Sequence, residues 1–161
     1  MDKLKYKNID LFYKTYGNPG KPAVVLLHGY LESMQIWNNF VEYLKDDLFL
    51  ITPDLPGHGY SGVYNETHTM EEMADAIRIL IDNLKLERIH LAGHSMGGYV
   101  TMAFRELFPE RLNSYILFHS HCFEDTEEKK QNREKEVTLI KTGKKNLIIN
   151  ANIPRLFTKQ F

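Results

Sequence analysis

The sequence predicts an α/β fold: a mostly parallel sheet with helices on both faces. Short apolar runs alternate along the chain with stretches in which apolar residues recur at helical spacing. One of these runs, residues 23–27, is continuously apolar, which is typical of a strand covered on both faces. Three glycine-containing loops (28–31, 53–62 and 93–98) each follow such a run. Alternating strands and helices imply right-handed crossovers, so the loops should meet at the carboxyl edge of the sheet, where ligands bind.

The first half of the chain supplies an antiparallel hairpin, two further strands and one helix. Residues 4–16 carry apolar side chains on alternating positions, which predicts a hairpin at the sheet edge, and the turn residues around Pro19 end it. Apolar residues at helical spacing predict a first helix over 34–45. The apolar run 49–52 is the next short strand, and it leads into a loop that is too rich in glycine and proline to form regular structure.

The second half repeats the strand–helix pattern. Thr69 and Glu72 form a capping box that opens a second helix. The apolar run 89–92 predicts the strand that follows, and a third helix begins after the next glycine-containing loop and ends before Pro109. Residues 115–118 form one more apolar strand.

The C-terminal part of the chain has a different composition and hydrophobic pattern. Residues 124–136 are almost entirely charged, Gly143 interrupts the pattern, and short apolar clusters follow it. These features indicate helices with solvated faces that lie over the sheet, rather than another strand–helix repeat. We therefore divide the sequence into a sheet-forming part, residues 1–121, and a helical part, residues 122–161.

Composition excludes several classes of protein. The 161 residues fit one domain, and 43% of them are hydrophobic, which is enough for a core. Twenty basic and 21 acidic residues leave a formal charge of −1, which gives no reason to expect nucleic acid or an anionic membrane as a partner. Cys122 is the single cysteine, so no internal disulfide forms and a reducing compartment is expected. Residues 1–6 lack the apolar core of a secretory signal, and no run approaches the ~20 apolar residues that span a bilayer, so we expect a soluble cytoplasmic protein.

The turn Gly93-His94-Ser95-Met96-Gly97 matches the G-x-S-x-G pattern of a nucleophile elbow, in which a serine sits on a tight strand-to-helix turn. Glycine is needed on both sides because larger side chains would collide with neighbouring backbone. The turn pushes the Ser95 hydroxyl out of the sheet, and the helix that starts there directs backbone N–H groups at negative charge that forms nearby. The pattern predicts a nucleophile, and the competing interpretation is a structural serine in a glycine-rich turn.

Three motifs in this order and spacing resemble those of the α/β-hydrolase fold family: His28-Gly29, residues 54–61 and residues 93–98. The resemblance extends over essentially the whole chain and is closest to the small esterase, lactonase and haloperoxidase-like branch. It implies that residues 1–121 are the N-terminal part of the hydrolase core and that residues 122–161 are the start of the helical cap. The fold would thus be truncated after the start of the cap.

The resemblance also implies roles for individual residues. Ser95 would be the nucleophile, and the backbone N–H groups of Tyr30 and Met96 would form the oxyanion hole. His28 and His58 would be structural, each supporting its own loop. Four residues would line the substrate pocket: Leu31, Tyr99, Leu156 and Phe157.

The acid and the histidine base of the family's triad have no counterpart at the expected place. Family members carry them after the cap, in the order Ser, acid, His, and a single-domain fold of this kind takes about 200–250 residues. We therefore expect both groups outside the 161 residues. His119, His121 and Glu124 are the alternative, although lining the site mouth or bonding to the cap fits the two histidines better. Asp54 precedes the elbow, so fixing its own loop suits it better than acting as the triad acid.

The strand 115–118 would be an exposed apolar edge, which invites pairing with another chain. We expect a C-terminal fragment or another chain to cover this edge, and an isolated monomer is the least favoured state. The remaining partner is a small-molecule substrate.

These features favour a serine hydrolase that cleaves a small carboxylic ester or lactone through an acyl-enzyme on Ser95. No cofactor is implied, and no metal is expected because the histidines lack metal-ligand spacing. Two alternatives stay open. One is a non-catalytic ligand-binding protein or inactive fragment on the same scaffold. The other is a perhydrolase or haloperoxidase-like activity.

Overall fold

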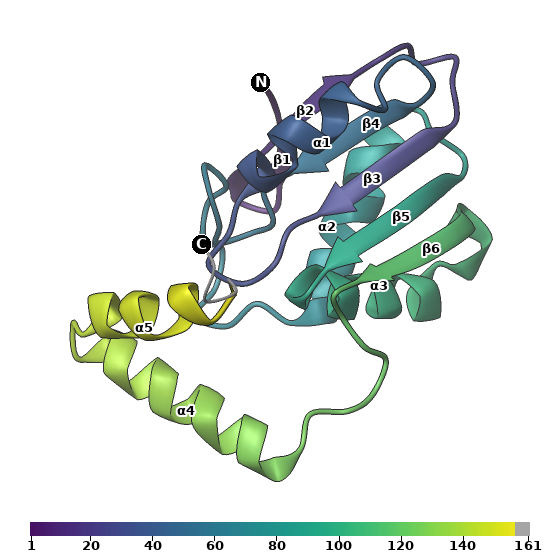
Figure 1. Cartoon of the computed structure of the whole chain (residues 1–161). Helices are drawn as coiled ribbons and strands as arrows, with labels where there is room; N and C mark the ends of the chain where they lie inside the picture. Colours follow the sequence, from purple (N-terminus) through teal and green to yellow (C-terminus); the bar gives the residue numbers. More distant parts are fainter. Residues whose placement is uncertain (157–161) are drawn as a thin grey trace. The chain divides into compact units, whose positions relative to one another are not determined.

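The computed structural model describes residues 1–156. The chain divides into two compact units, Met1–Cys122 and Phe123–Phe161. The larger unit is built on one six-stranded sheet (Figure 1). Its strands are β1 (Asp2–Tyr6), β2 (Ile9–Tyr16), β3 (Ala23–Leu27), β4 (Phe49–Pro53), β5 (Ile89–His94) and β6 (Leu112–Phe118).

The strands lie in the order β1-β2-β4-β3-β5-β6. The hairpin β1–β2 forms one edge and pairs antiparallel with β4 through β2. The other four strands pair parallel with their neighbours. The predicted α/β fold with a mostly parallel sheet is therefore confirmed, and the loops that follow β3, β4 and β5 leave from the same edge.

Helices cover both faces of this sheet. They are η1 (Met34–Trp37), α1 (Asn38–Glu42), α2 (Met70–Asn83), α3 (Met96–Leu107) and the short η2 (Pro109–Arg111). Figure 1 shows α1 in front of the sheet and α2 and α3 behind it. The strand order explains the two layers, because the step from β3 to β4 runs toward the hairpin edge and the later steps run the other way. Right-handed crossovers then place α1 and the pair α2–α3 on opposite faces.

The two faces of the sheet are buried unequally. The face under α2 and α3 has a large core whose central side chains have no exposed surface: Ile77, Leu80, Ile89 and Phe104. Full burial of each such side chain contributes about 1.5–3 kcal/mol. The face under α1 has a smaller core cluster: Leu26, Trp37, Val41, Leu50 and Ala92. Because η1 and α1 are short, they cover less of the sheet than α2 and α3 do.

Two elements differ from the sequence-based expectation. The helix predicted over 34–45 is a 3₁₀ turn followed by α1, and it ends at Glu42. The chain after it forms tight turns in which the N–H groups of Leu44 and Asp47 reach back three residues. These turns lie so close to Gly17 that a Cβ there would overlap the Leu48 carbonyl. β6 begins at Leu112 rather than Tyr115, because pairing with β5 extends it through polar residues.

The second unit is helical, as predicted. Its described elements are α4 (Glu127–Lys141), α5 (Lys145–Asn152) and η3 (Ile153–Leu156). The Thr126 side chain accepts a hydrogen bond from the Lys129 N–H and caps α4. Lys130 pairs with Glu124 and Glu127 on a solvated face. The assignment of this unit to a cap stays a prediction. Within residues 1–156, no helix is both long and apolar enough to cross a bilayer.

Candidate active site

Ser95 lies at the junction of β5 and α3 in a strained backbone conformation, with φ 50° and ψ −113°. Few non-glycine residues adopt a positive φ, and such strain costs about 1–3 kcal/mol and persists only where the surroundings hold it. Two hydrogen bonds hold it here. The Ser95 N–H donates to the Phe118 carbonyl at 3.1 Å, and the Ser120 hydroxyl donates to the Ser95 carbonyl at 2.8 Å. The Ser95 side chain is exposed and makes no capping hydrogen bond to α3, so α3 does not engage its hydroxyl.

The glycines around Ser95 are required by close contacts between backbone segments. A Cβ on Gly93 would overlap the Gly97 carbonyl oxygen, and a Cβ on Gly97 would lie 2.7 Å from the His28 carbonyl oxygen. Gly98 faces Ser120, whose hydroxyl a Cβ would overlap. The turn thus needs glycine for the reason that the motif predicts, which is close contact with neighbouring backbone. The turn also packs directly against the end of β3.

The loop after β3 lies against the elbow. A Cβ on Gly29 would come within 3.1 Å of the Ser95 Cβ. Tyr30 follows Gly29 directly, and Leu31 has a positive φ of 61°. On the other side, Met96 is the first residue of α3, whose leading N–H groups have no intrahelical acceptor. The fold therefore brings the Gly29 backbone against Ser95 and starts a helix directly after it.

Glu32 ties this loop to the elbow, a role that no sequence motif signals. Its Oε2 accepts the Gly29 N–H at 2.6 Å and the His94 Nδ1–H at 2.9 Å. Its side chain is only 14% exposed. One carboxyl group thus bonds to both segments that flank Ser95. The single clue in the sequence is an acidic residue three positions after Gly29.

Asp54 fixes the loop that follows β4, residues 53–62, from inside. Its carboxyl group is fully buried and accepts the Met34 N–H at 2.7 Å and the Tyr60 N–H at 2.8 Å. Gly59 closes over this group, because a Cβ there would overlap the Asp54 carboxyl oxygens. The expected loop-fixing role of Asp54 is confirmed, and the bond to Met34 extends it to the start of η1.

His28 is buried between the loops that follow β3 and β4. Its Nδ1–H donates to the Gly29 carbonyl at 2.8 Å, and its Nε2 accepts the Leu55 N–H at 3.0 Å. Burial lowers the pKa of His28 from 6.5 to about 4. The His58 ring lies beside it, with the ring centroids 5.1 Å apart and the ring planes tilted by 55°. These bonds give His28 the structural role that was expected of it.

The other predicted residues are placed as follows. The Tyr99 hydroxyl lies 3.2 Å from His121 Nε2, and the His119 ring lies 6.3 Å from that of His94. Leu156 ends η3, although its side chain, like all of Phe157, lies outside the described residues. The predicted substrate pocket therefore stays a prediction, as does a histidine base from this region.

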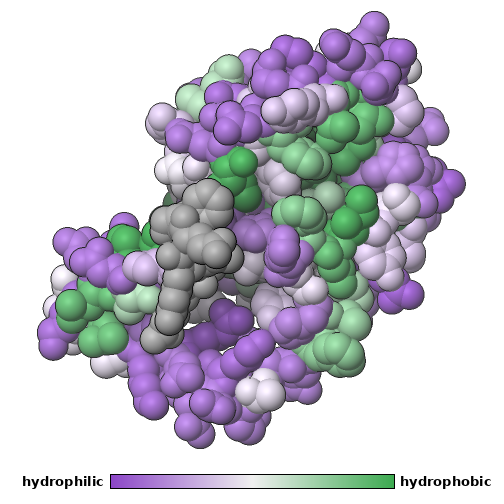
Figure 2. Space-filling model, in the orientation of Figure 1, coloured by the Kyte–Doolittle hydropathy of each residue, from purple (hydrophilic) through white to green (hydrophobic). Residues whose placement is uncertain are grey.

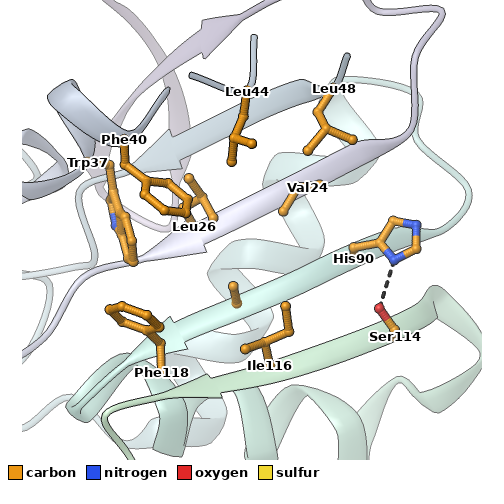
Figure 3. A pocket seen from close by; sticks show the side chains of 11 residues that line it. Val24, Leu26, Trp37, Phe40, Leu44, Leu48, His90, Ser114, Ile116 and Phe118 are labelled. Carbon is orange, nitrogen blue, oxygen red and sulfur yellow. Dashed lines mark hydrogen bonds between the residues drawn. The ribbon is translucent and has the colours of Figure 1, made fainter. Parts of the chain in front are cut away.

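A cavity of about 330 Å³ lies elsewhere, on the face of the sheet that carries α1 (Figure 3). Neither Leu31 nor Tyr99 lines it. Within residues 1–156, no group of three or more His, Cys, Asp or Glu side chains is placed to hold a metal ion.

A strained serine between a parallel strand and a helix, with a glycine-containing loop packed against it, defines the class of this fold. The family model described as "alpha/beta hydrolase fold" matches residues 22–142. The chain belongs to the α/β-hydrolase fold family.

Solved and curated relatives agree with this assignment. A thermophilic esterase from Thermogutta terrifontis is 32% identical in sequence and superposes with a TM-score of 0.89, over 96% of this chain and 59% of the esterase. The 3-oxoadipate enol-lactonase 2 of Acinetobacter baylyi is 28% identical over 72% of this chain and 43% of its own length. A dihydrolipoyllysine-residue acetyltransferase component of the acetoin cleaving system of Pseudomonas putida is 35% identical over 65% of this chain and 28% of its own. The chain thus spans less than two thirds of each of these relatives.

Proposed function

We propose that this chain carries the nucleophile and the oxyanion-binding groups of a serine hydrolase that cleaves a small carboxylic ester or lactone. The observation that carries the proposal is the backbone of Ser95. Its positive φ presents an exposed hydroxyl that α3 does not use as a cap, beside the Gly29 loop. An esterase and an enol-lactonase among the relatives support the substrate class.

The proposed reaction begins when the Ser95 hydroxyl oxygen attacks the acyl carbon and its proton passes to a histidine base. The N–H groups of Tyr30 and Met96 bind the oxyanion of the tetrahedral intermediate. The intermediate expels the alcohol, which takes the proton from the base, and leaves the acyl group on Ser95. Water, deprotonated by the same base, then hydrolyses this ester and restores the serine.

We place the histidine base and its acid outside these residues. The chain matches only 59% of the Thermogutta esterase, which leaves about two fifths of that protein to carry further groups. We also propose that residues 1–121 are the N-terminal part of the core and that residues 122–161 start the cap. A C-terminal fragment or another chain would cover the edge of the sheet at β6, where Tyr115 and Ile116 are exposed.

Labelling with a fluorophosphonate tests the nucleophile in the 161-residue chain itself. Other serine hydrolases keep about 10³–10⁴-fold catalysis over water from the oxyanion hole and binding when a triad member is removed. We therefore expect one phosphonate adduct, located on Ser95 by peptide mass spectrometry. The Ser95→Ala variant should show no adduct there.

The Thermogutta esterase serves as the positive control, and this chain should label far more slowly if, as we propose, the base lies outside these residues. Labelling of the wild-type chain no faster than background in Ser95→Ala would contradict the proposal. It would favour a non-catalytic ligand-binding protein on the same scaffold.

A further inference from the structure

Glu32 carries a carboxyl group that the fold holds close to Ser95. Hydrophilic residues make up much of the surface that Figure 2 shows, but only 14% of the Glu32 side chain is exposed. A Cβ on Gly29 would lie 2.8 Å from Glu32 Oε2 and 3.1 Å from the Ser95 Cβ. The same Cβ would lie 3.2 Å from His94 Nδ1. The carboxyl group, the Ser95 side chain and the His94 ring therefore converge on one backbone position, Gly29.

Two donors hold this carboxyl group in place. Taking a carboxylate out of water is unfavourable unless hydrogen-bond donors replace the water. Glu32 Oε2 accepts the Gly29 N–H at 2.6 Å and the His94 Nδ1–H at 2.9 Å. The first donor belongs to the loop after β3 and the second to the end of β5. One oxygen atom thus joins the two segments, so neither can shift without breaking one of these bonds.

The bond to Gly29 also closes a short turn over Tyr30 and Leu31. The Glu32 side chain reaches back three residues to a backbone N–H, as the glutamate of a capping box does. Leu31 has a positive φ of 61°, a conformation that persists in a non-glycine residue only where the surroundings fix it. The Tyr30 N–H lies within the ring that this bond closes, so the same bond fixes the direction in which that N–H points.

We propose that Glu32 is a positioning residue, which holds the Tyr30 N–H at a fixed place relative to the Ser95 hydroxyl. The inference rests on the proposed function, because it takes Ser95 as the nucleophile and Tyr30 as an oxyanion donor. Such a donor is effective when it is already about 2.7–3.1 Å from the place where the oxyanion forms. A shift of about 1 Å in a positioned group can cost about 10²-fold in rate. Glu32 acts through Gly29 and His94 and is assigned no contact with the substrate.

The role depends on the reach of the carboxyl oxygen and not on its negative charge. A carboxylate near a developing oxyanion would by itself repel it. Here two N–H groups point at the carboxylate and partly offset its charge. Glutamine at position 32 would keep an oxygen that can accept both hydrogen bonds without the charge. Aspartate would keep the charge, but its carboxyl group is one methylene closer to the backbone.

The rate at which a fluorophosphonate labels the full 161-residue chain measures this role. The Ser95 oxygen bonds to phosphorus, fluoride leaves and the serine proton passes to water, while the phosphonyl oxygen takes the place of the oxyanion. We expect Glu32→Ala to lower the second-order rate constant of labelling at Ser95 about tenfold or more. Glu106→Ala is the matched control, because it removes an exposed carboxyl group from the far end of α3. It should label within about twofold of the wild type.

Two conservative variants separate reach from charge. Glu32→Gln should label within about threefold of the wild type, because both hydrogen bonds can be kept. Glu32→Asp should label about as slowly as Glu32→Ala. Circular dichroism checks that each variant folds, and the comparison of Glu32→Gln with Glu32→Asp tests the proposal even if Glu32→Ala does not fold.

Amide hydrogen exchange gives a readout that does not depend on the chemistry of Ser95. The Gly29 N–H should exchange about tenfold faster or more in Glu32→Ala, because it loses its acceptor. The Tyr60 N–H, which bonds to Asp54, should keep its wild-type rate. Exchange followed by NMR at these two amides distinguishes a local loss of the loop contact from general destabilisation.

Three results would overturn the inference and leave the proposed function intact. One is a wild-type chain that labels at Ser95 no faster than Glu32→Ala does. Another is faster labelling of Glu32→Asp than of Glu32→Gln, which would assign the effect to charge. The third is Gly29 exchange that is unchanged in Glu32→Ala. Labelling of the wild type that does not exceed the Ser95→Ala background would instead overturn the proposed function, and this inference with it.

Discussion

Replacing Asp54 by alanine is expected to lower the free energy of unfolding by about 4 kcal/mol, because each buried N–H left without an acceptor costs about 1–3 kcal/mol. Two such groups lose their partner, the N–H of Met34 and the N–H of Tyr60. The carboxyl group has no exposed surface, and it is the acceptor that these donors have inside the wild-type fold. Urea unfolding followed by circular dichroism measures the loss.

Two further variants make this result specific. Asp54→Asn keeps one carbonyl oxygen as an acceptor and should lose roughly half as much free energy. Asp47→Ala removes an exposed carboxyl group from the turn before β4 and should change stability by less than about 0.5 kcal/mol. Equal losses for Asp54→Ala and Asp47→Ala would show that the buried carboxyl group does not hold these loops.

Acid should destabilise the protein through His28. Burial lowers its folded pKa from 6.5 to about 4, so between these pH values the unfolded chain binds a proton that the folded chain does not. Stability from this group is therefore complete above pH 6.5 and falls as the pH drops toward 4. At about 1.36 kcal/mol per pKa unit, the loss is about 3 kcal/mol. The hydrogen bonds agree with this direction, because protonated Nε2 could not accept the Leu55 N–H.

Urea unfolding at a series of pH values between 4 and 7 measures this effect. His28→Gln lacks the titrating group, and its amide oxygen can accept the Leu55 N–H, so its stability should depend less on pH over this range. His90→Gln alters a histidine on the α1 face of the sheet and should retain the wild-type dependence. A wild-type slope that persists unchanged in His28→Gln would assign the acid sensitivity to other groups.

Local signals in the sequence predict the sheet and most helices well. The continuous apolar run 23–27 is β3 itself, and the capping box of Thr69 and Glu72 opens α2 with both of its hydrogen bonds. These signals work because burial on both faces and the capping of N–H groups depend on adjacent residues. Only the end of the first helix is wrong in the prediction, because that end depends on turns that pack against the distant Gly17.

The candidate site can likewise be predicted from the sequence only in part. The glycines around Ser95 follow from the tightness of one turn, so a short motif finds them. Glu32 bonds to His94 across 62 positions, and Ser120 bonds to Ser95 across 25. Only the fold brings these residues together, and their types alone carry no signal for it. The unequal cover of the two sheet faces likewise depends on the strand order.

A chimera tests the catalytic proposal most directly. In it, this chain replaces the segment of the Thermogutta terrifontis esterase that it matches, so the rest of the esterase can supply the base and the acid. The measurement is the initial rate of p-nitrophenyl acetate hydrolysis, with circular dichroism to establish folding. If Ser95 is the nucleophile, the chimera hydrolyses the ester and Ser95→Ala lowers kcat by about 10⁴–10⁶-fold. A folded chimera that is no faster than its Ser95→Ala variant would contradict the assignment of Ser95 as the nucleophile.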